Sequence, residues 1–234
     1  MSSVGKNNET NRIAWLKKSL AQIPSGSRIL DAGAGEQKFR GLCSHLTYVA
    51  QDFALYDGKG NSKGLQTGRW DQANLDIISD ISNIPEPDGS FDAIICIEVL
   101  EHLPDPIAAI REFYRLLRVD GILIITAPFC SLTHFAPYHF YSGFNRYFYE
   151  KNLQDNGFII EEISENGNFF EYIAQELHRV SVISEKYAAM LPTRLERMAI
   201  HIVLKMLTRF SEKGSSSSDL LHYGCMVKAT KRNC

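Results

Sequence analysis

No apolar run in the 234 residues is long enough to span a bilayer, and the polar N-terminus lacks the apolar core of a signal peptide. Cysteines are few, and their spacing shows neither close pairs nor a metal-binding pattern. An odd number of cysteines, one of them inside an apolar strand, predicts reduced thiols and a cytoplasmic protein. The cysteines are Cys43, Cys96, Cys130, Cys225 and Cys234.

An excess of positive charge is also missing. The formal net charge is -2, and the sequence contains neither a dense basic stripe nor a separate RNA-binding module. We therefore do not expect nucleic acid as a partner. Because 44% of the residues are hydrophobic, a chain of this length can bury one sizeable core. We expect residues 1–234 to form a single domain.

The most informative segment that is present is Ile-Leu-Asp-Ala-Gly-Ala-Gly at 29–35. It predicts a buried strand that ends in a carboxylate, Asp31, followed by a glycine turn that opens a helix. Asp52 follows the next strand, where a carboxylate can accept hydrogen bonds from ribose hydroxyls. A dinucleotide-binding turn needs a third glycine, but that position holds Lys38, and Asp31 would repel a pyrophosphate. The segment therefore favours a zwitterionic nucleoside such as S-adenosylmethionine, and a dehydrogenase is the least favoured enzyme class.

Strands that alternate with helices predict a parallel sheet with helices on both faces. The expected strands are 28–32, 47–51, 75–81, 91–98, one after Asp120-Gly121, 158–163 and 220–230. The expected helices are 11–23, 36–45, 106–117, one that ends at Asn156-Gly157, 169–189 and 193–210. Residues 53–74 form a long loop, either a lid anchored by Tyr56 and Trp70 or a mobile surface loop. We expect Gly214 and the serines at 215–218 to be a flexible stretch.

Five motifs between residues 28 and 164 resemble those of class I S-adenosylmethionine-dependent methyltransferases, in the same order. The resemblance is to the small-molecule branch that includes quinone and sugar methyltransferases. It implies a Rossmann-like α/β fold with a seven-stranded, mostly parallel sheet, whose antiparallel last strand lies between strands five and six. It also implies that residues 167–215 are a helical insertion before the last strand. Gln37 departs from the pattern, because many members carry a small residue there. The motifs are 31–35, Asp52, Asp80-Ile81, 91–102 and 116–128.

The resemblance implies that the cofactor is S-adenosylmethionine, with S-adenosylhomocysteine as product. It assigns Asp31 and Gly33 to the methionine end of the donor, Asp52 to the ribose, and Asp80 with Ile81 to the adenine. The full set of expected cofactor residues is Asp31, Gly33, Gly35, Asp52, Phe53, Asp80, Ile81 and Cys96.

A hydroxyl acceptor needs a base or a metal, because its proton must leave. The segment Glu98-Val-Leu-Glu101-His102 offers a candidate metal set. The same Glu-x-x-Glu-His pattern occurs in quinone O-methyltransferases and small-RNA 2′-O-methyltransferases, where the resemblance implies a divalent ion and a further histidine. His134 or His139 could supply that histidine. We favour the alternative, in which Glu98 and His102 shape the pocket through hydrogen bonds.

Residues 133–149 combine two histidines, many aromatic residues and an arginine in the segment where the acceptor should bind. The candidate catalytic residues are His134 or His139 as general base, together with Glu98. The candidate acceptor-binding residues are Tyr138, Tyr141 and Arg146. The favoured function is O-methylation of a small molecule or a sugar or glycan precursor. The alternatives are a quinone-type methyltransferase, an RNA 2′-O-methyltransferase and a non-catalytic nucleoside-binding scaffold.

The segment 192–210 predicts a helix with a broad apolar face and four basic residues. We expect this face to pack on the domain or on a second subunit, which would make a homodimer. The alternative is peripheral contact with an anionic membrane, which would suit a lipid-linked acceptor.

Overall fold

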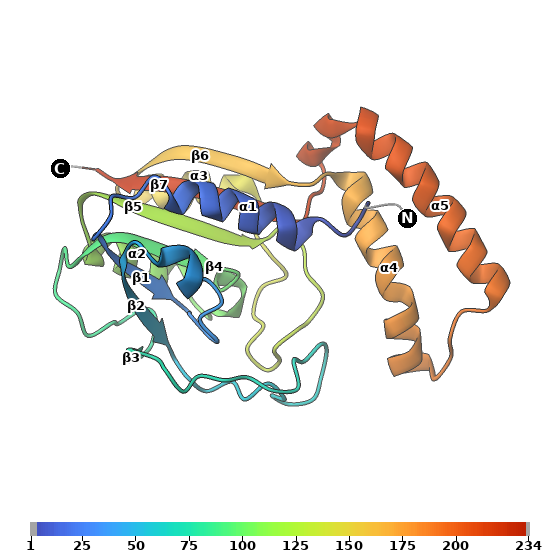
Figure 1. Ribbon diagram of the computed structural model, residues 1–234, viewed down its shortest axis with the longest axis horizontal. Helices are drawn as coiled ribbons and strands as arrows, with labels where there is room; N and C mark the ends of the chain where they lie inside the picture. The colour runs from blue at the N-terminus through green and yellow to red at the C-terminus, as the bar shows by residue number, and fades with distance from the viewer. Residues whose placement is uncertain (1–3, 233–234) are drawn as a thin grey trace. The chain divides into compact units, whose positions relative to one another are not determined.

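A seven-stranded sheet organises the chain in the computed structural model, which describes residues 4–232 (Figure 1). The strand order is β3-β2-β1-β4-β5-β7-β6. Contacts divide the described chain into two compact units, one of residues 15–164 and 224–232 and the other of residues 4–14 and 165–223. Cys43, Cys96 and Cys225 are buried and Cys130 is exposed, whereas Cys234 lies outside the described residues.

Five strands of the sheet run parallel to one another. They are β1 (Arg28–Ala32), β2 (Thr47–Asp52), β3 (Ile77–Ile78), β4 (Phe91–Ile97) and β5 (Leu117–Pro128). The last strand, β7 (Gly224–Lys231), runs antiparallel to β5 and lies between β5 and β6 (Phe158–Asn166). This topology confirms the predicted Rossmann-like fold with its antiparallel last strand.

Helices cover both faces of the sheet in the larger unit. On one face, α2 (Pro106–Leu116) and α3 (Arg146–Asp155) belong to the same apolar cluster as Leu30 of β1. On the other face, the C-terminal half of α1 (Asn8–Leu20) packs in a second cluster with Ile29. Successive residues of a strand point to opposite faces. The unbroken apolar runs of the central strands therefore fill both layers.

The predicted helix boundaries hold well at α2 and less well at α1. The Asp105 carboxylate accepts hydrogen bonds from the backbone N–H groups of Ile107 and Ala108, both at 3.0 Å, which is the N-cap that the sequence predicted. The first helix spans Asn8–Leu20 rather than 11–23. It ends early because Ile23 donates its backbone N–H to Leu20, three residues back, as in a tight 3₁₀ turn.

The predicted helix at 36–45 is wrong. Turns and a short 3₁₀ helix, η1 (Arg40–Cys43), take its place. The cause is Gln37, whose φ of 57° lies in the left-handed region that an α-helix cannot use. Its side chain holds this conformation, since Nε2 donates to the carbonyl of Asn74 at 2.7 Å and Oε1 accepts from Arg40 Nε at 2.7 Å.

Two strands also differ from the prediction. The third strand is reduced from 75–81 to Ile77–Ile78, because the Asp76 carboxylate accepts the backbone N–H of Ala50 at 2.8 Å, a donor that a longer strand would use. The fifth begins at Leu117, before the expected turn, and Asp120 has a φ of 61° within it. Its register against β4 shifts in this region, as in a β-bulge.

The smaller unit contains a helical hairpin of α4 (Phe169–Ala188) and α5 (Arg194–Lys213), close to the predicted 169–189 and 193–210. Both helices precede β7, as expected for the insertion at 167–215. The serine stretch after α5 is not a loop but a 3₁₀ helix, η3 (Ser215–Asp219), in which Ser217 Oγ donates to the Gly214 carbonyl at 2.6 Å. The last strand consequently begins at Gly224 rather than at 220.

Candidate cofactor and acceptor site

The glycine turn after β1 is fixed against the end of β2. The backbone N–H groups of Gly33 and Ala34 both donate to the carbonyl of Gln51, at 2.9 and 2.8 Å. Gly33 has a φ of 78°, and a Cβ added there would lie 2.6 Å from a methyl carbon of Val99. Only glycine satisfies both the conformation and the close approach.

Asp52, the last residue of β2, meets this turn. Its Oδ2 accepts from the Gly35 backbone N–H at 2.9 Å. Its Oδ1 accepts from the Ala54 backbone N–H and from Gln72 Nε2, both at 3.0 Å. The structure therefore brings together the two acids and two glycines of the sequence pattern, and the role of Asp52 toward a ribose stays a prediction.

Asp31 is the second acid at this edge of the sheet. Its side chain is buried and accepts a hydrogen bond from the Tyr48 hydroxyl. Burial raises the pKa of Asp31 to about 7, against the lowering effect of the Tyr48 hydrogen bond and with a further rise from the charge of Asp52. A cationic ligand group placed beside this carboxyl would stabilise its ionised form.

The other expected cofactor residues lie in different environments. Asp80 is exposed and accepts from the backbone N–H and the hydroxyl of Ser82, at 2.8 and 2.7 Å. Ile81 is buried in the core beside it. Phe53 is partly exposed and packs edge-on against Tyr138, with ring centroids 5.0 Å apart. Cys96 is fully buried in β4, where burial raises its thiol pKa well above the usual range.

The long loop 53–74 contacts the segment that follows β5. A parallel bridge pairs Leu65 with His134, and the carbonyl of Leu65 accepts from the Phe135 backbone N–H at 3.0 Å. The backbone N–H of Leu65 donates to the Thr133 carbonyl at 2.9 Å. Gly64 permits this approach, because a Cβ added to it would lie 2.4 Å from the Thr133 oxygen. These contacts hold the loop against the segment after β5, and its role as a lid stays a prediction.

Aromatic side chains of the loop pack against an aromatic residue of the segment after β5. Tyr56 stacks on Phe135 with a centroid distance of 4.6 Å, and Trp70 packs edge-on against both rings. A Cβ added at Gly35 would lie 2.5 Å from the Trp70 ring, so the indole covers the glycine turn. A hollow of about 860 Å³ is lined by residues that follow Gly35 and Trp70 in the chain: Glu36, Gln37, Arg40, Asp71, Ala73, Asn74, Leu75 and Asp76.

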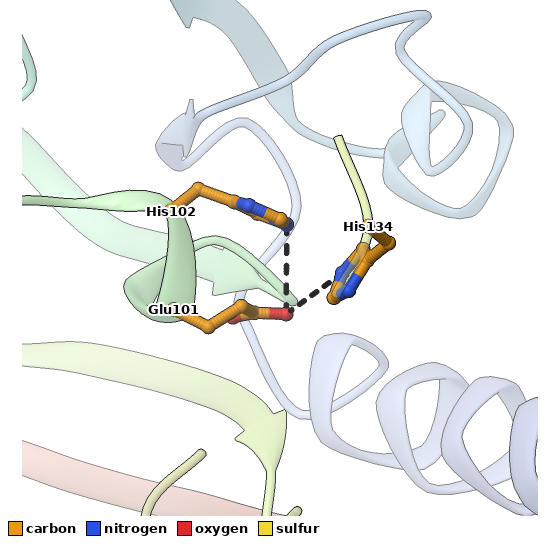
Figure 2. A group of neighbouring side chains, drawn as sticks. All are labelled: Glu101, His102 and His134. Atoms are coloured by element: carbon orange, nitrogen blue, oxygen red, sulfur yellow. Dashed lines mark ion pairs between the residues drawn. The ribbon is translucent and has the colours of Figure 1, made fainter. Parts of the chain in front are cut away.

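Glu101, His102 and His134 form a cluster whose side chains point toward one another (Figure 2). Glu101 Oε1 is 3.7 Å from His102 Nε2 and 3.8 Å from His134 Nε2. On the far side of each ring, His102 Nδ1 is 2.5 Å from the Tyr138 carbonyl and His134 Nδ1 is 2.8 Å from the Leu132 carbonyl. A carbonyl oxygen only accepts, so each Nδ1 carries a proton and each ring directs its Nε2 toward Glu101.

The pKa values of His102 and His139 are both lowered. Burial lowers the pKa of His102 to about 3, with a further lowering from His134. Burial and His134 also lower the pKa of His139, whose ring centroid is 4.7 Å from that of His134. Near neutral pH, His102 is therefore an electron-pair donor and not a cation.

The cluster differs in one member from the set expected from the sequence. Atoms of Glu101, His102 and His134 that could bind a metal lie within 4.8 Å of one another. Glu98, with a φ of 57° just after β4, instead accepts from the Thr126 hydroxyl at 2.8 Å. A carboxylate with two imidazoles suits a divalent ion such as Mn²⁺ or Zn²⁺, and less strongly Mg²⁺. Both imidazoles have the outward Nδ1–H to carbonyl bond that commonly orients histidine ligands.

Comparison with known proteins identifies the family. A family model described as a methyltransferase domain matches residues 7–182. The chain belongs to this methyltransferase family. Binding of S-adenosylmethionine is typical of its members.

The relatives of this methyltransferase-family chain include O-methyltransferases. A ubiquinone biosynthesis O-methyltransferase of Xanthomonas oryzae pv. oryzae (strain PXO99A) is 34% identical over 107 residues, which cover 44% of this chain and 43% of that protein. The tRNA (carboxymethyluridine(34)-5-O)-methyltransferase alkbh8 of Xenopus tropicalis is 31% identical over 126 residues, which cover 52% of this chain and 19% of that protein. The chain thus spans less than half the length of these two relatives.

A solved structure shares the fold. Phosphoethanolamine N-methyltransferase 2 of Haemonchus contortus, in complex with S-adenosyl-L-methionine, matches with a TM-score of 0.56 and 19% identity. The match covers 96% of this chain and 53% of that one. At this identity the likeness concerns the fold alone.

The residues that the sequence predicted for acceptor binding have different surroundings in the structure. Tyr138 lies at the cluster, because its carbonyl contacts His102 and its ring contacts Phe53. Tyr141 donates to the Pro104 carbonyl at 3.2 Å. Arg146, at the start of α3, pairs with Glu150 at 3.1 Å. His139 Nε2 lies 3.2 Å from the Ser131 hydroxyl.

Two residues at the site carried no sequence signal of their own. Tyr48 is the second residue of β2, where a tyrosine is an ordinary strand residue. Phe135 stands among many aromatic residues, and its stacking on His102, with centroids 5.1 Å apart, depends on the fold. Neither contact follows from spacing along the chain.

Proposed function

We propose that this protein transfers a methyl group from S-adenosylmethionine to a hydroxyl oxygen of a small molecule. The observation that carries the proposal is the cluster in which the imidazoles of His102, which is neutral near pH 7, and His134 face Glu101. The sulfonium of the donor is a good leaving group, so much of catalysis is alignment. A hydroxyl must also lose its proton, and this cluster supplies groups that can take it or lower its pKa.

The donor would lie on the glycine turn. Asp52 would accept hydrogen bonds from the ribose hydroxyls, and Asp31 would pair with the ammonium group of the methionine end. Their support is the position of both carboxylates at the carboxyl ends of neighbouring parallel strands, β1 and β2, where ligands of open α/β sheets bind. Asp80 and Ile81 would contact the adenine. Since Trp70 covers Gly35, the donor would displace the indole as it enters.

The proton would leave by one of two routes. In the first, His134 or His139 acts as general base. In the second, Glu101, His102 and His134 would hold a divalent ion, and such an ion would lower the pKa of the acceptor hydroxyl. The donor set and the outward Nδ1–H bonds fit such an ion. In both routes Glu98 orients the end of β4 through its bond to Thr126.

The acceptor is proposed to be a planar ring bearing a hydroxyl, such as a quinone precursor, in preference to a sugar. Phe53, Phe135 and Tyr138 give the cluster aromatic walls. The similarity to a ubiquinone biosynthesis O-methyltransferase of Xanthomonas oryzae supports the same class. The similarity to the tRNA methyltransferase of Xenopus tropicalis favours an RNA acceptor, whereas the net charge of -2 opposes RNA binding.

Calorimetric titration with S-adenosylmethionine, with NAD as control, tests the donor. We expect micromolar binding of the first and none of the second. Transfer of a labelled methyl group to catechol-type phenols, sugars and short RNAs then tests the acceptor. Methylation of the phenol oxygen supports the proposal, whereas transfer only to nitrogen, or well-folded protein that does not bind the donor, overturns it.

Chelation separates the two proton routes. With EDTA present, a metal-dependent enzyme loses transfer and regains it with Mn²⁺ or Mg²⁺. A general-base enzyme keeps its activity in EDTA. A direct readout is Mn²⁺ binding by electron paramagnetic resonance, which His134→Ala should abolish and Glu98→Gln should leave in place.

A further inference from the structure

Helices α4 and α5 form a hairpin (Figure 1). This hairpin exposes a row of large apolar side chains. Leu195 is 70% exposed and Met190, in the turn between the helices, is 69% exposed. A patch of this kind on a folded protein marks an interaction site more often than chance. We call this set the hairpin face: Tyr187, Met190, Leu191, Leu195, Met198 and Ile202.

The apolar core of the hairpin lies on a different side of α5. Leu204 and Leu207 are buried, and they form a small cluster with Ala174 of α4. Residues 195, 198, 202 and 206 recur every three or four positions and stay exposed. The helix thus has two apolar stripes, one packed and one open to solvent, and folding of the hairpin accounts only for the first.

A row of basic side chains runs beside the exposed stripe. Arg194, Arg197, His201, Lys205 and Arg209 each precede an apolar residue by one position, so they share one flank of α5. Between residues 194 and 209 the only acid is Glu196, and the capping box at Thr193 uses its carboxylate. This local excess of positive charge contrasts with the net charge of -2 of the whole chain.

We infer that the hairpin face binds the surface of an anionic lipid bilayer. The apolar residues would enter the boundary between headgroups and acyl chains, and the basic row would contact anionic headgroups. None of the described helices is long and apolar enough to cross a membrane, so the hairpin would lie in the interface. A second copy of this chain fits less well. A two-fold contact presents the same patch from both copies, so it would bring the basic row near its own counterpart without matching acids.

Sedimentation of the full chain with vesicles tests this inference. We expect binding to vesicles that mix phosphatidylcholine with phosphatidylglycerol, little binding to phosphatidylcholine alone, and weaker binding at higher salt. A basic residue near an anionic surface strengthens binding about fivefold. The triple variant Arg194→Glu, Arg197→Glu, Lys205→Glu should therefore bind at least about 100-fold more weakly.

Matched variants separate the apolar and the basic contributions. The pair Leu191→Asp and Leu195→Asp should remove binding although the basic row is intact. Two controls should leave binding intact. They are Leu220→Asp, at a residue that is 73% exposed and lies outside the hairpin, and Lys17→Glu on α1. Circular dichroism and an unchanged affinity for S-adenosylmethionine would show that the variants fold.

Three results would overturn the inference. The first is equal binding to neutral and anionic vesicles. The second is no binding to either. The third is a dimer in analytical ultracentrifugation that Leu195→Asp dissociates, together with no binding to vesicles. None of these outcomes depends on methyl transfer, so this test is independent of the proposed function.

Discussion

At the scale of single residues, a side chain that is proposed to bind the donor lowers the stability of the folded protein. Asp31 is buried with an acid, Asp52, nearby, and burial raises its pKa from 3.8 to about 7. The folded protein therefore binds this proton more tightly than the unfolded chain. The contribution of Asp31 to stability is fully present below about pH 4 and is lost as the pH rises to about 7. The same carboxyl is proposed to pair with the donor, which would explain why a costly buried acid is placed there.

Asp31→Asn should therefore stabilise the ligand-free protein at high pH. Each pKa unit corresponds to about 1.4 kcal/mol, so the upper bound on the gain at pH 8 is about 4 kcal/mol. Urea unfolding at pH 4, 6 and 8 measures this gain in the free energy of unfolding. Asp219→Asn, at an exposed residue, is the control. The affinity for S-adenosylmethionine should fall in the same variant. A pH dependence equal to that of the control would contradict the assigned pKa.

Asp52→Ala should weaken binding of S-adenosylmethionine at least about tenfold. A charge-assisted hydrogen bond contributes about 1.5–3 kcal/mol, and the proposed ribose contact has up to two of them. Calorimetric titration measures the loss. Asp57→Ala is a control, since Asp57 accepts only from backbone groups of its own loop in the bonds described, at Lys59 and Gly60. Unchanged affinity in Asp52→Ala would remove this residue from the donor site.

Tyr149→Phe should raise the stability of the protein. Tyr149 is fully buried, and its hydroxyl has no hydrogen-bond partner among the described residues. An unsatisfied buried polar group costs about 1–3 kcal/mol, which phenylalanine avoids. Tyr223→Phe is the matched opposite, because the Tyr223 hydroxyl donates to Glu171 Oε2 at 2.6 Å. Thermal unfolding should show a higher Tm for the first variant and a lower Tm for the second. Two equal losses would indicate a partner for Tyr149.

At the scale of elements, the loop 53–74 acquires its position from backbone contacts that glycines allow. Gly64 and Gly68 both have positive φ, at 64° and 85°, but only Gly64 closely approaches the segment after β5. The loop has no helix and no strand of its own beyond the bridge at Leu65. Its stability therefore depends on a few contacts, and local opening there is expected to precede unfolding of the sheet.

Gly64→Ala should separate the lid from the segment after β5. The added Cβ would lie 2.4 Å from the Thr133 oxygen, whereas at Gly68 nothing lies within 4 Å. Gly68→Ala is thus a control that carries the same backbone strain without the clash. Hydrogen exchange of residues 60–66 should be faster in Gly64→Ala than in Gly68→Ala. Equal exchange would show that the bridge does not hold the loop.

At the scale of the whole molecule, the sequence alone predicted a parallel sheet and the edge at which the acids meet, and the resemblance to methyltransferases implied the place of the last strand. Apolar runs that end in Asp31, Asp52 and Glu98 predict parallel strands, and the carboxyl ends of such strands share one edge. The N-cap of α2 and both helices of the hairpin also followed from local signals, because capping and helical periodicity depend on near neighbours.

Only the tertiary structure decided the rest. A left-handed conformation at Gln37 replaced the expected helix, and it depends on a contact with Asn74 that lies 37 positions away. Likewise, Glu101 and not Glu98 forms the cluster with His102 and His134. This contact depends on how the segment after β5 folds. Local propensity cannot encode contacts between residues distant in the chain, since packing of the whole fold chooses them.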